Sequence, residues 1–412
     1  MILREVNRVG EGQKNIPKLR FKGYEDAWEQ RKLEEFLKER TERAEGDEEL
    51  LSVTINKGVI RQLESDKKNN SSENKSNYKL VYKGDIPYNS MRMWQGAVGV
   101  SQFEGIVSPA YTVLIPTEEA DGKFLMELFK KSSSLQIFTR WSQGLTSDTW
   151  NLKYPTLSKL SFFVPYIKEQ NKIAKLLQEL DDLITLHQRK YDALKSMKKT
   201  LLSKMFPKNG EDVPEIRFKE FTYAWEQRKL GDVADKVTVK NSNLQYIETF
   251  TNSAEVGIIS QRDYFDHDIA NLSNLDGYYI VQKEDFVYNP RISTSAPVGP
   301  INRNKLGRIG VMSPLYTVFR THNVDTTYLE YFFKSQYWHS FMKFHGDSGA
   351  RADRFSIKDA IFFEMPIPLP DIDEQQKIGD YLNSVDYLIT LHQRKLEELK
   401  NMKKTLLQQM FV

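Results

Sequence analysis

The chain has 412 residues, of which 40% are hydrophobic and 28% are charged, and this composition is typical of a globular protein with two or three domains. The absence of cysteine excludes disulfide bonds, thiolate nucleophiles and cysteine-ligated metal sites. The formal net charge of +3 permits nucleic-acid binding only if basic side chains are clustered locally.

The N-terminal residues and the hydropathy of the chain indicate whether it is secreted or inserted in a membrane. Residues 1–10 carry charges at Arg4, Glu5 and Arg8 and have no apolar core, which is not typical of a signal peptide. No run of 18 apolar residues occurs that would predict a membrane-spanning helix. We therefore expect a cytoplasmic protein.

The first half of the chain predicts short strands followed by helices. β-rich runs bounded by Gly, Pro or Asn predict strands at residues 51–55, 78–82, 97–101 and 110–114, whereas the polar segment 65–77 predicts a loop. Residues 121–129 are typical of a helix. Apolar residues spaced by three or four from Ile173 to Met205 predict one long amphipathic helix over 169–206, with Pro165 and Pro207 at its ends.

The second half repeats the first. Residues 386–411 match 181–206 at 19 of 26 positions, and residues 214–230 match 17–33 at 11 of 17. A second long helix is therefore predicted over 374–411, and a further helix over 327–341. Between these repeated segments the two halves share only a few isolated residues, such as Tyr88-Asn89 and Tyr288-Asn289. Each half is thus a repeated frame that holds a variable insert of about 130 residues.

The frame resembles a known family. Each half has a P-x-I-x-E-Q-x-K-I helix start, at Pro165–Ile173 and Pro370–Ile378, and then a long helix with the sequence LITLHQRK. In this respect the chain resembles the specificity subunit of a type I restriction–modification system. The resemblance implies an α+β fold: two mixed α/β target recognition domains separated by two long antiparallel coiled-coil helices, related by a pseudo-two-fold internal repeat.

The resemblance also implies a domain organisation and partners. Residues 1–164 would form the first target recognition domain, 165–207 the central spacer helix, 208–369 the second recognition domain and 370–412 the C-terminal spacer helix. Each recognition domain would read one half of a bipartite double-stranded DNA target. The helices would set the spacing and dock two methyltransferase subunits, and restriction/translocase subunits would complete the complex. S-adenosylmethionine, ATP and Mg would belong to these partners, with no cofactor or metal in this chain.

Base contacts are expected in the inserts, from basic, amide, hydroxyl and aromatic side chains. Arg pairs with guanine and Gln with adenine, but at least half of the hydrogen bonds to DNA go to its backbone, so each candidate is also open to a role as a phosphate anchor or a plain surface residue. The candidates in the first insert are Lys57, Arg61, Arg92, Trp94, Gln95, Arg140, Gln143, Thr146 and Ser147. The candidates in the second insert are Gln261, Arg262, Arg291, Ser293, Thr294, Arg351 and Arg354.

The long helices carry the residues expected to pack against each other. The predicted coiled-coil positions are Ile173, Leu177, Leu180, Ile184, Leu194, Ile378, Leu382, Ile389, Leu399 and Leu406. His187 and His392 lie beside this seam, and we expect a register or partner contact there rather than a metal site. We expect Lys198-Lys199 and Lys403-Lys404 to be solvated, with contact to DNA or a methyltransferase as the alternative.

Two other classes of function are compatible with a chain of this size and composition. A self-sufficient methyltransferase or nuclease is disfavoured because the chain has no phosphate-binding loop, no G-x-G-x-x-G and no H-E-x-x-H, so no catalytic residue is assigned. A protein–protein scaffold built on a helical hairpin remains the alternative. Trp28 and Trp225, in the repeated AWEQRKL element, are expected to pack within the frame.

Overall fold

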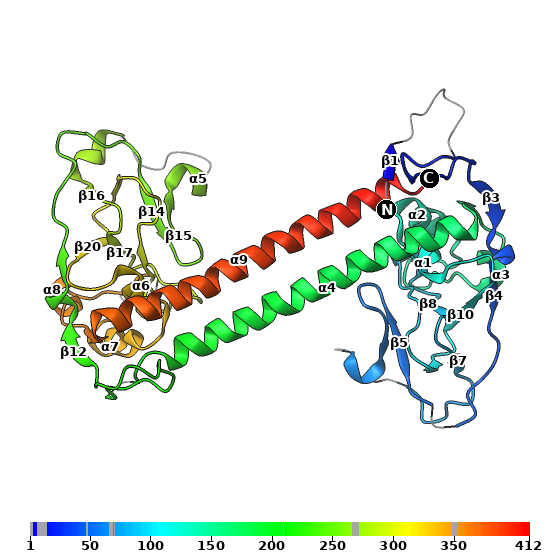
Figure 1. The fold of residues 1–412 in the computed structure, drawn as a ribbon, viewed down its shortest axis with the longest axis horizontal. Helices are drawn as coiled ribbons and strands as arrows, with labels where there is room; N and C mark the ends of the chain where they lie inside the picture. Colours follow the sequence, from blue (N-terminus) through cyan, green and yellow to red (C-terminus); the bar gives the residue numbers. More distant parts are fainter. Residues whose placement is uncertain are drawn as a thin grey trace. The chain divides into compact units, whose positions relative to one another are not determined.

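The structure is a computed structural model, and it describes residues 3–5, 15–46, 48–65, 69, 71–208, 210–265, 272–347 and 353–412. The chain divides into two compact units, residues 1–188 with 394–412 and residues 189–393 (Figure 1). Each unit contains one of the variable inserts, the first part of one long helix and the last part of the other. These long helices are α4 (Ile167–Lys204) and α9 (Ile372–Gln409), each of 38 residues.

The first unit contains a three-stranded antiparallel sheet and several two-stranded antiparallel ladders. The sheet has the order β4-β10-β8, and the pairs are β1-β2, β11-β3, β5-β6 and β7-β9. The strands are β1 (Leu3–Glu5), β2 (Leu19–Phe21), β3 (Glu29–Lys32), β4 (Leu37–Glu39), β5 (Leu51–Thr54), β6 (Gly58–Arg61), β7 (Lys79–Val81), β8 (Ile86–Asn89), β9 (Gly105–Val107), β10 (Tyr111–Pro116) and β11 (Ser161–Val164). The helices besides α4 are α1 (Gly122–Lys130), α2 (Ser132–Trp141) and α3 (Tyr154–Leu157), with short 3-10 turns η1 (Leu33–Glu35), η2 (Gln62–Glu64) and η3 (Met93–Gln95).

The second unit is built in the same way. Its antiparallel sheet has the order β13-β20-β17-β18, and its two-stranded ladders are β12-β21, β14-β15 and β16-β19. The strands are β12 (Glu226–Lys229), β13 (Ala234–Lys236), β14 (Phe250–Ser253), β15 (Gly257–Ser260), β16 (Tyr279–Val281), β17 (Phe286–Tyr288), β18 (Ile301–Arg303), β19 (Gly310–Met312), β20 (Thr317–Thr321) and β21 (Pro366–Leu369). The helices besides α9 are α5 (Gln261–Phe265), α6 (Thr326–Lys334), α7 (Trp338–His345) and α8 (Asp359–Phe362), with 3-10 turns η4 (Leu230–Asp232) and η5 (Leu272–Gly277).

The repeated tryptophans pack within the frame, as the sequence predicts. Trp28 is 1% exposed and meets Phe124 and Phe411 edge-on, with ring centroids 5.8 and 6.1 Å apart. Trp225 is 4% exposed and meets Tyr328 with ring centroids 6.0 Å apart. Both tryptophans therefore belong to the cores of their units and are not available for stacking on bases.

The repeated Glu-Gln pair at the start of α4 fastens the first unit together. The Arg20 guanidinium donates two hydrogen bonds to the Glu169 carboxylate, at 2.7 and 2.8 Å, and both side chains are buried. The Gln170 Oε1 accepts the backbone N–H of Asp121 at 3.0 Å. The Asp121 carboxylate in turn caps α1 by accepting the Phe124 N–H at 2.9 Å. The motif thus joins the N-terminal segment, the domain helix and the long helix.

The same contacts recur in the second unit. Arg217 donates two hydrogen bonds to Glu374, at 2.7 and 2.8 Å. The Gln375 Oε1 accepts the Asp325 N–H at 2.9 Å, and the Asp325 carboxylate caps α6 through the Tyr328 N–H at 2.7 Å. The E-Q-x-K-I motif therefore has a structural role at the helix entry, which matches the interpretation of the sequence.

The long helices run antiparallel within each unit (Figure 1), and an ion pair joins them in each. In the first unit, Lys403 of α9 donates to Asp181 of α4 at 2.7 Å. In the second, Lys198 of α4 pairs with Asp386 of α9 at 2.5 Å. Among the positions predicted for the coiled coil, Ile184, Leu194 and Ile389 are half-buried. The others are buried in the cores that the helices share with the rest of their units: Ile173, Leu177, Leu180, Leu399 and Leu406 in the first, and Ile378 and Leu382 in the second. The predicted α+β class with antiparallel coiled-coil helices is confirmed.

Three predictions about local structure were wrong. Residues 97–101 form no named strand, because only a single bridge joins Val98 to Tyr88 there. The helix predicted over 327–341 is two helices, α6 and α7, since Ser335 caps the first and the chain turns before Trp338. Lys198 and Lys403 are engaged in ion pairs rather than simply solvated.

Candidate nucleic-acid interface

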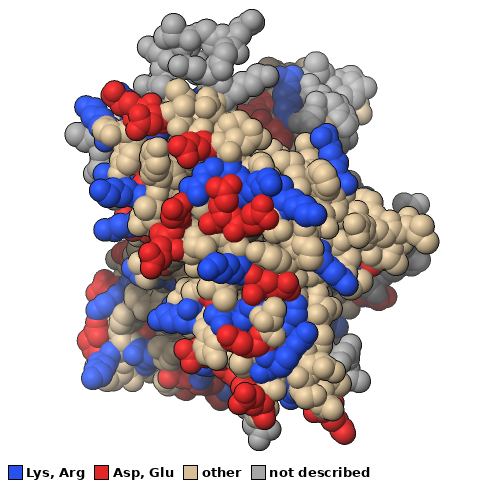
Figure 2. Space-filling view, turned by 90° about the vertical axis from the view of Figure 1, so that its right-hand side faces the viewer, with Lys and Arg blue, Asp and Glu red and all other residues tan. Residues whose placement is uncertain are grey.

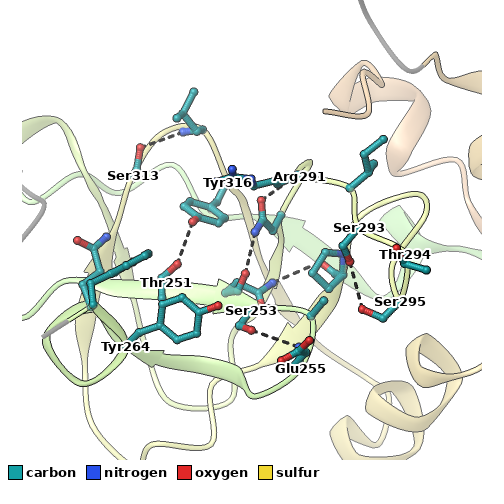
Figure 3. A pocket seen from close by; sticks show the side chains of 18 of the residues that line it. Thr251, Ser253, Glu255, Tyr264, Arg291, Ser293, Thr294, Ser295, Ser313 and Tyr316 are labelled. Carbon is teal, nitrogen blue, oxygen red and sulfur yellow. Dashed lines mark hydrogen bonds between the residues drawn. The ribbon is translucent and has the colours of Figure 1, made fainter. Parts of the chain in front are cut away.

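A pocket of about 970 Å³ lies in the second unit, and it is lined by several residues that the sequence predicts to contact DNA. Gln261 lines it, as do Arg291, Ser293 and Thr294, which are labelled in Figure 3. They come from two places in the sequence, the end of the β14-β15 hairpin and the segment after β17. The remaining lining is mostly hydroxyl, amide and aromatic side chains, which suits hydrogen bonding and stacking with bases.

Hydrogen bonds between asparagine side chains and the backbone hold the walls of this pocket together. The Asn252 amide donates to the Val287 carbonyl at 2.7 Å, and its Oδ1 accepts from Asn302 at 2.7 Å. The Asn289 amide donates to the Asn252 carbonyl at 2.7 Å. These bonds fix the hairpin on the central sheet, so the pocket is formed by regular structure rather than by loops alone.

The segment after β17 pairs with a second loop. A backbone bridge joins Arg291 to Arg354, and the Ile292 N–H donates to the Asp353 carbonyl at 3.1 Å. Arg354 therefore lies beside the pocket-lining segment. Arg351 falls outside the described residues.

Two neighbouring candidates of the second domain, Gln261 and Arg262, differ in their burial and in their place relative to the pocket. Gln261 is 8% exposed and its amide donates to the Phe250 carbonyl at 3.2 Å, so it forms part of the wall. Its Oε1 is buried without a partner among the described residues. Arg262 is exposed on α5 next to Gln261, outside the pocket lining. The contacts of both residues with DNA stay predictions.

In the first domain, the predicted residues gather around η3 and the loop after α2. Trp94 of η3 meets Trp150 edge-on, with centroids 5.2 Å apart, while Arg92 and Gln95 are half-exposed beside it. The Leu152 N–H donates to the Ser90 carbonyl at 2.9 Å, which seats the end of the loop on the segment after β8. This arrangement corresponds to the pairing of Phe355 N–H with the Pro290 carbonyl in the second domain.

The loop 144–149 itself is short and closed. Gln143 and Asn151 form a backbone bridge at its base. Gly144 has φ +151°, and a Cβ there would lie 2.6 Å from the Thr149 carbonyl oxygen, so the turn requires glycine. Thr146 and Ser147 are exposed at its tip, and Arg140 is exposed on the last turn of α2. All of them are accessible to a large ligand.

The hairpin β5-β6 carries two further candidates. Lys57 is exposed in its three-residue turn. Arg61, at its end, pairs with Glu49 at 3.1 Å and lies over the Phe103 ring at 5.0 Å. Part of the charge of Arg61 is thus neutralised within the domain, by a residue twelve positions earlier whose proximity depends on the tertiary fold.

The structure also adds residues that the sequence analysis missed. Glu255, at the tip of the β14-β15 hairpin, and Tyr264 and Tyr316 line the pocket. The Tyr316 hydroxyl lies 3.2 Å from the Thr251 hydroxyl (Figure 3). The strand–turn–glycine pattern before Gly257 was the available signal for a hairpin tip, but it did not identify the pocket.

One face of the molecule shows how charged side chains are distributed there. On the face drawn in Figure 2, basic and acidic side chains lie intermixed. No group of three or more His, Cys, Asp or Glu side chains that could hold a metal ion occurs among the described residues. In the same part of the chain, no helix has the length and hydropathy needed to cross a membrane.

Comparisons with known proteins give the family. The family model for the type I restriction modification DNA specificity domain matches residues 25–196 and 223–401. The type I restriction enzyme MjaVIII specificity subunit of Methanocaldococcus jannaschii is 25% identical over 258 residues, which are 59% of this chain and 59% of that protein. The putative MjaX specificity subunit of the same organism is 23% identical over 354 residues, which are 81% of this chain and 79% of that protein.

A solved structure agrees with the fold. The type I restriction–modification S subunit from M. genitalium has a TM-score of 0.51 and 16% identity, over 96% of this chain and 99% of that one. This likeness concerns the fold alone. Since the family model covers both repeats and most of the chain, the protein belongs to the type I restriction–modification DNA specificity family.

Proposed function

We propose that each recognition domain of this specificity subunit reads one half of a bipartite double-stranded DNA target. The observation that carries the proposal is the pocket of the second domain, where four residues predicted from sequence to contact bases converge. The first domain has an equivalent loop seated in the same way on its central sheet. Two different inserts on one repeated frame would recognise two different half-sites.

The long helices would dock two methyltransferase subunits and set the distance between the half-sites. Each unit leaves large apolar side chains of these helices in solvent. In the first unit Leu183 and Leu186 are 43% and 46% exposed, and in the second Leu388 and Leu391 are 40% and 48% exposed. Leucines on a helix that already buries one face are suited to a protein partner.

The chemistry would reside in the partners. Methyltransferase subunits would bring S-adenosylmethionine, and restriction/translocase subunits would bring ATP and Mg, while this chain contributes recognition without catalysis. Because the proposed substrate is double-stranded DNA, we place the action of the chain in the cytoplasm.

Binding to randomised DNA tests this function. The full chain, assembled with the methyltransferase of its system, should enrich one motif of two short blocks separated by an unspecified spacer. Binding should weaken steeply with salt, because phosphate contacts release counterions. Binding without any sequence preference at every salt concentration would favour the protein–protein scaffold instead.

A further inference from the structure

The pocket of the second recognition domain presents one acidic and one basic group. Of the described residues that line it, Glu255 and Arg291 alone carry a charge. Glu255 lies at the tip of the β14-β15 hairpin, and Arg291 lies in the segment after β17 (Figure 3). Both side chains are exposed.

Neither charge is neutralised within the part of the chain that the structure describes. The interactions of the two residues there involve their backbones. The Glu255 N–H donates to the Ser253 hydroxyl at 3.2 Å, and the Arg291 N–H donates to the Asn289 Oδ1 at 2.9 Å. In contrast, several other arginines of this domain pair with carboxylates, as Arg308 does with Glu248 at 2.7 Å. The two free ionic groups are therefore available to a ligand.

Both groups are held at defined places. The strands of the hairpin pair in register from Phe250 with Ser260 to Ser253 with Gly257, and Gly257 has the left-handed φ of +77° that the turn requires. The bond to Asn289 fixes the backbone of Arg291, and the asparagine bonds described above tie both segments to the same sheet. A ligand would thus meet a carboxylate and a guanidinium on a preformed scaffold.

The chemistry of this pair matches one kind of base pair. In the major groove, guanine offers two acceptors, O6 and N7, to the forked donors of arginine, and the amino group of cytosine donates to a carboxylate. In an A·T pair the fork would meet the adenine amino group, which is itself a donor. The carboxylate of Glu255 and the guanidinium of Arg291 together therefore fit a G·C pair better than an A·T pair.

We propose that the second recognition domain reads a G·C pair in its half-site, with Arg291 on the guanine and Glu255 on the cytosine. The inference rests on the proposed function of this domain. It identifies two specificity-determining residues, one of which, Glu255, lies outside the set predicted from sequence.

The first domain supplies an internal comparison. Its hairpin turn follows the same register, and the residue that corresponds to Glu255 is Asn56. The Met91 N–H donates to the Asn89 Oδ1 at 3.0 Å, as Arg291 does to Asn289, so Met91 corresponds to Arg291. With an amide and a thioether in these places, the first domain should not read the corresponding base pair in this way.

The test compares the base preferences of the full chain and its variants, each assembled with the methyltransferase of its system and allowed to bind randomised duplexes. The wild type should require a G·C pair at one position of one half-site. Arg291→Lys and Glu255→Ala should each reduce the discrimination at that same position about ten-fold or more. The lysine keeps the charge but loses the fork, so a simple phosphate contact would survive this change. Arg228→Lys, an exposed arginine outside the pocket, is the matched control.

A second measurement uses the wild-type protein and so does not depend on the folding of variants. Replacing the guanine of that pair by 7-deazaguanine removes the N7 acceptor and should weaken binding by about ten-fold. The inference is overturned if the two variants relax different positions, if Arg291→Lys keeps full discrimination, or if 7-deazaguanine binds as well as guanine. A wild type that enriches no motif would remove the proposed function as well, whereas an intact motif with unaffected variants would remove the inference alone.

Discussion

At the scale of single residues, the identities shared by the two halves are explained by contacts inside each unit. Arg20 and Glu169 are 149 positions apart in the sequence, and they form a buried bidentate ion pair. The sequence shows that both residues recur, and the resemblance places Glu169 at a helix start. The sequence cannot show that Arg20 and Glu169 form an ion pair, because contact between residues so far apart in the chain is determined by the tertiary fold.

Removing one partner of this pair should destabilise the first unit strongly. Arg20→Ala would leave the buried Glu169 carboxylate without a counter-charge, at a cost of about 3–5 kcal/mol in the free energy of unfolding. Lys32→Ala is the control, since Lys32 pairs with Glu34 at an exposed site, and it should change stability by less than about 1 kcal/mol. Urea denaturation measures both, and equal small effects would contradict the structural role of the pair.

Asp181 should give the first unit a specific sensitivity to acid. Desolvation by burial acts to raise the pKa of Asp181, but hydrogen bonds from Lys123 and Lys403 outweigh it and hold the pKa below its usual value. A lowered pKa in the folded state means that the stabilisation is present above the pKa of the unfolded state and is lost as the pH falls through the folded value.

Thermal melting from pH 7 down to pH 2.5 tests this directly. Compared with Asp181→Asn, the wild type should be more stable near neutral pH, and the difference should shrink only below about pH 4. A constant difference over the whole range would show that Asp181 does not act through its charge.

At the scale of elements, periodicity predicted the long helices well and the smaller elements less well. The predicted ranges 169–206 and 374–411 differ from α4 and α9 by two residues at each end. The prediction of a single helix over 327–341 was wrong, because aromatic residues continue through the break near Ser335. The apolar pattern therefore does not show where the first helix ends. Leu183 and Met197 continue the apolar spacing but are 43% and 38% exposed, since a pattern alone cannot say which apolar residues meet a partner.

The antiparallel pairing of the helices makes a prediction about charge. Because Lys198 of α4 pairs with Asp386 of α9, Lys198→Asp and Asp386→Lys should each destabilise the second unit. The double variant should recover most of the loss, because it restores opposite charges across the seam. A double variant as unstable as the sum of the singles would show that the two positions do not interact.

At the scale of the whole molecule, the duplicated frame could be predicted from the sequence. The side chains that each insert presents to a ligand could not. The inserts share few residues, and their function depends on which side chains a fold brings to one surface. Gln261, Arg291, Ser293 and Thr294, which the sequence offers as candidates for DNA contact, line one pocket, whereas Glu255 in the same pocket was missed. The difference arises because hairpin tips carry little sequence signal beyond a turn.

If the helices set the spacing of the half-sites, a longer frame should lengthen the spacer. Four residues inserted after Arg189 and four after Arg394, the equivalent positions of the two repeats, add about 6 Å to each helix. The recognised motif should then gain about two base pairs in its unspecified spacer, with both half-sites unchanged. An unchanged spacer in a stably folded variant would contradict the role of the helices as a ruler.

The most direct test of the modular account is an exchange of one insert. Residues 51–160 would be replaced by the corresponding segment of another member of the family, and the methylated positions would be mapped in a host that carries this chain and its methyltransferase. One half of the recognised motif should change, while the other half and the spacer length stay as they were. A change in both halves would contradict the central claim that two independent domains read the target.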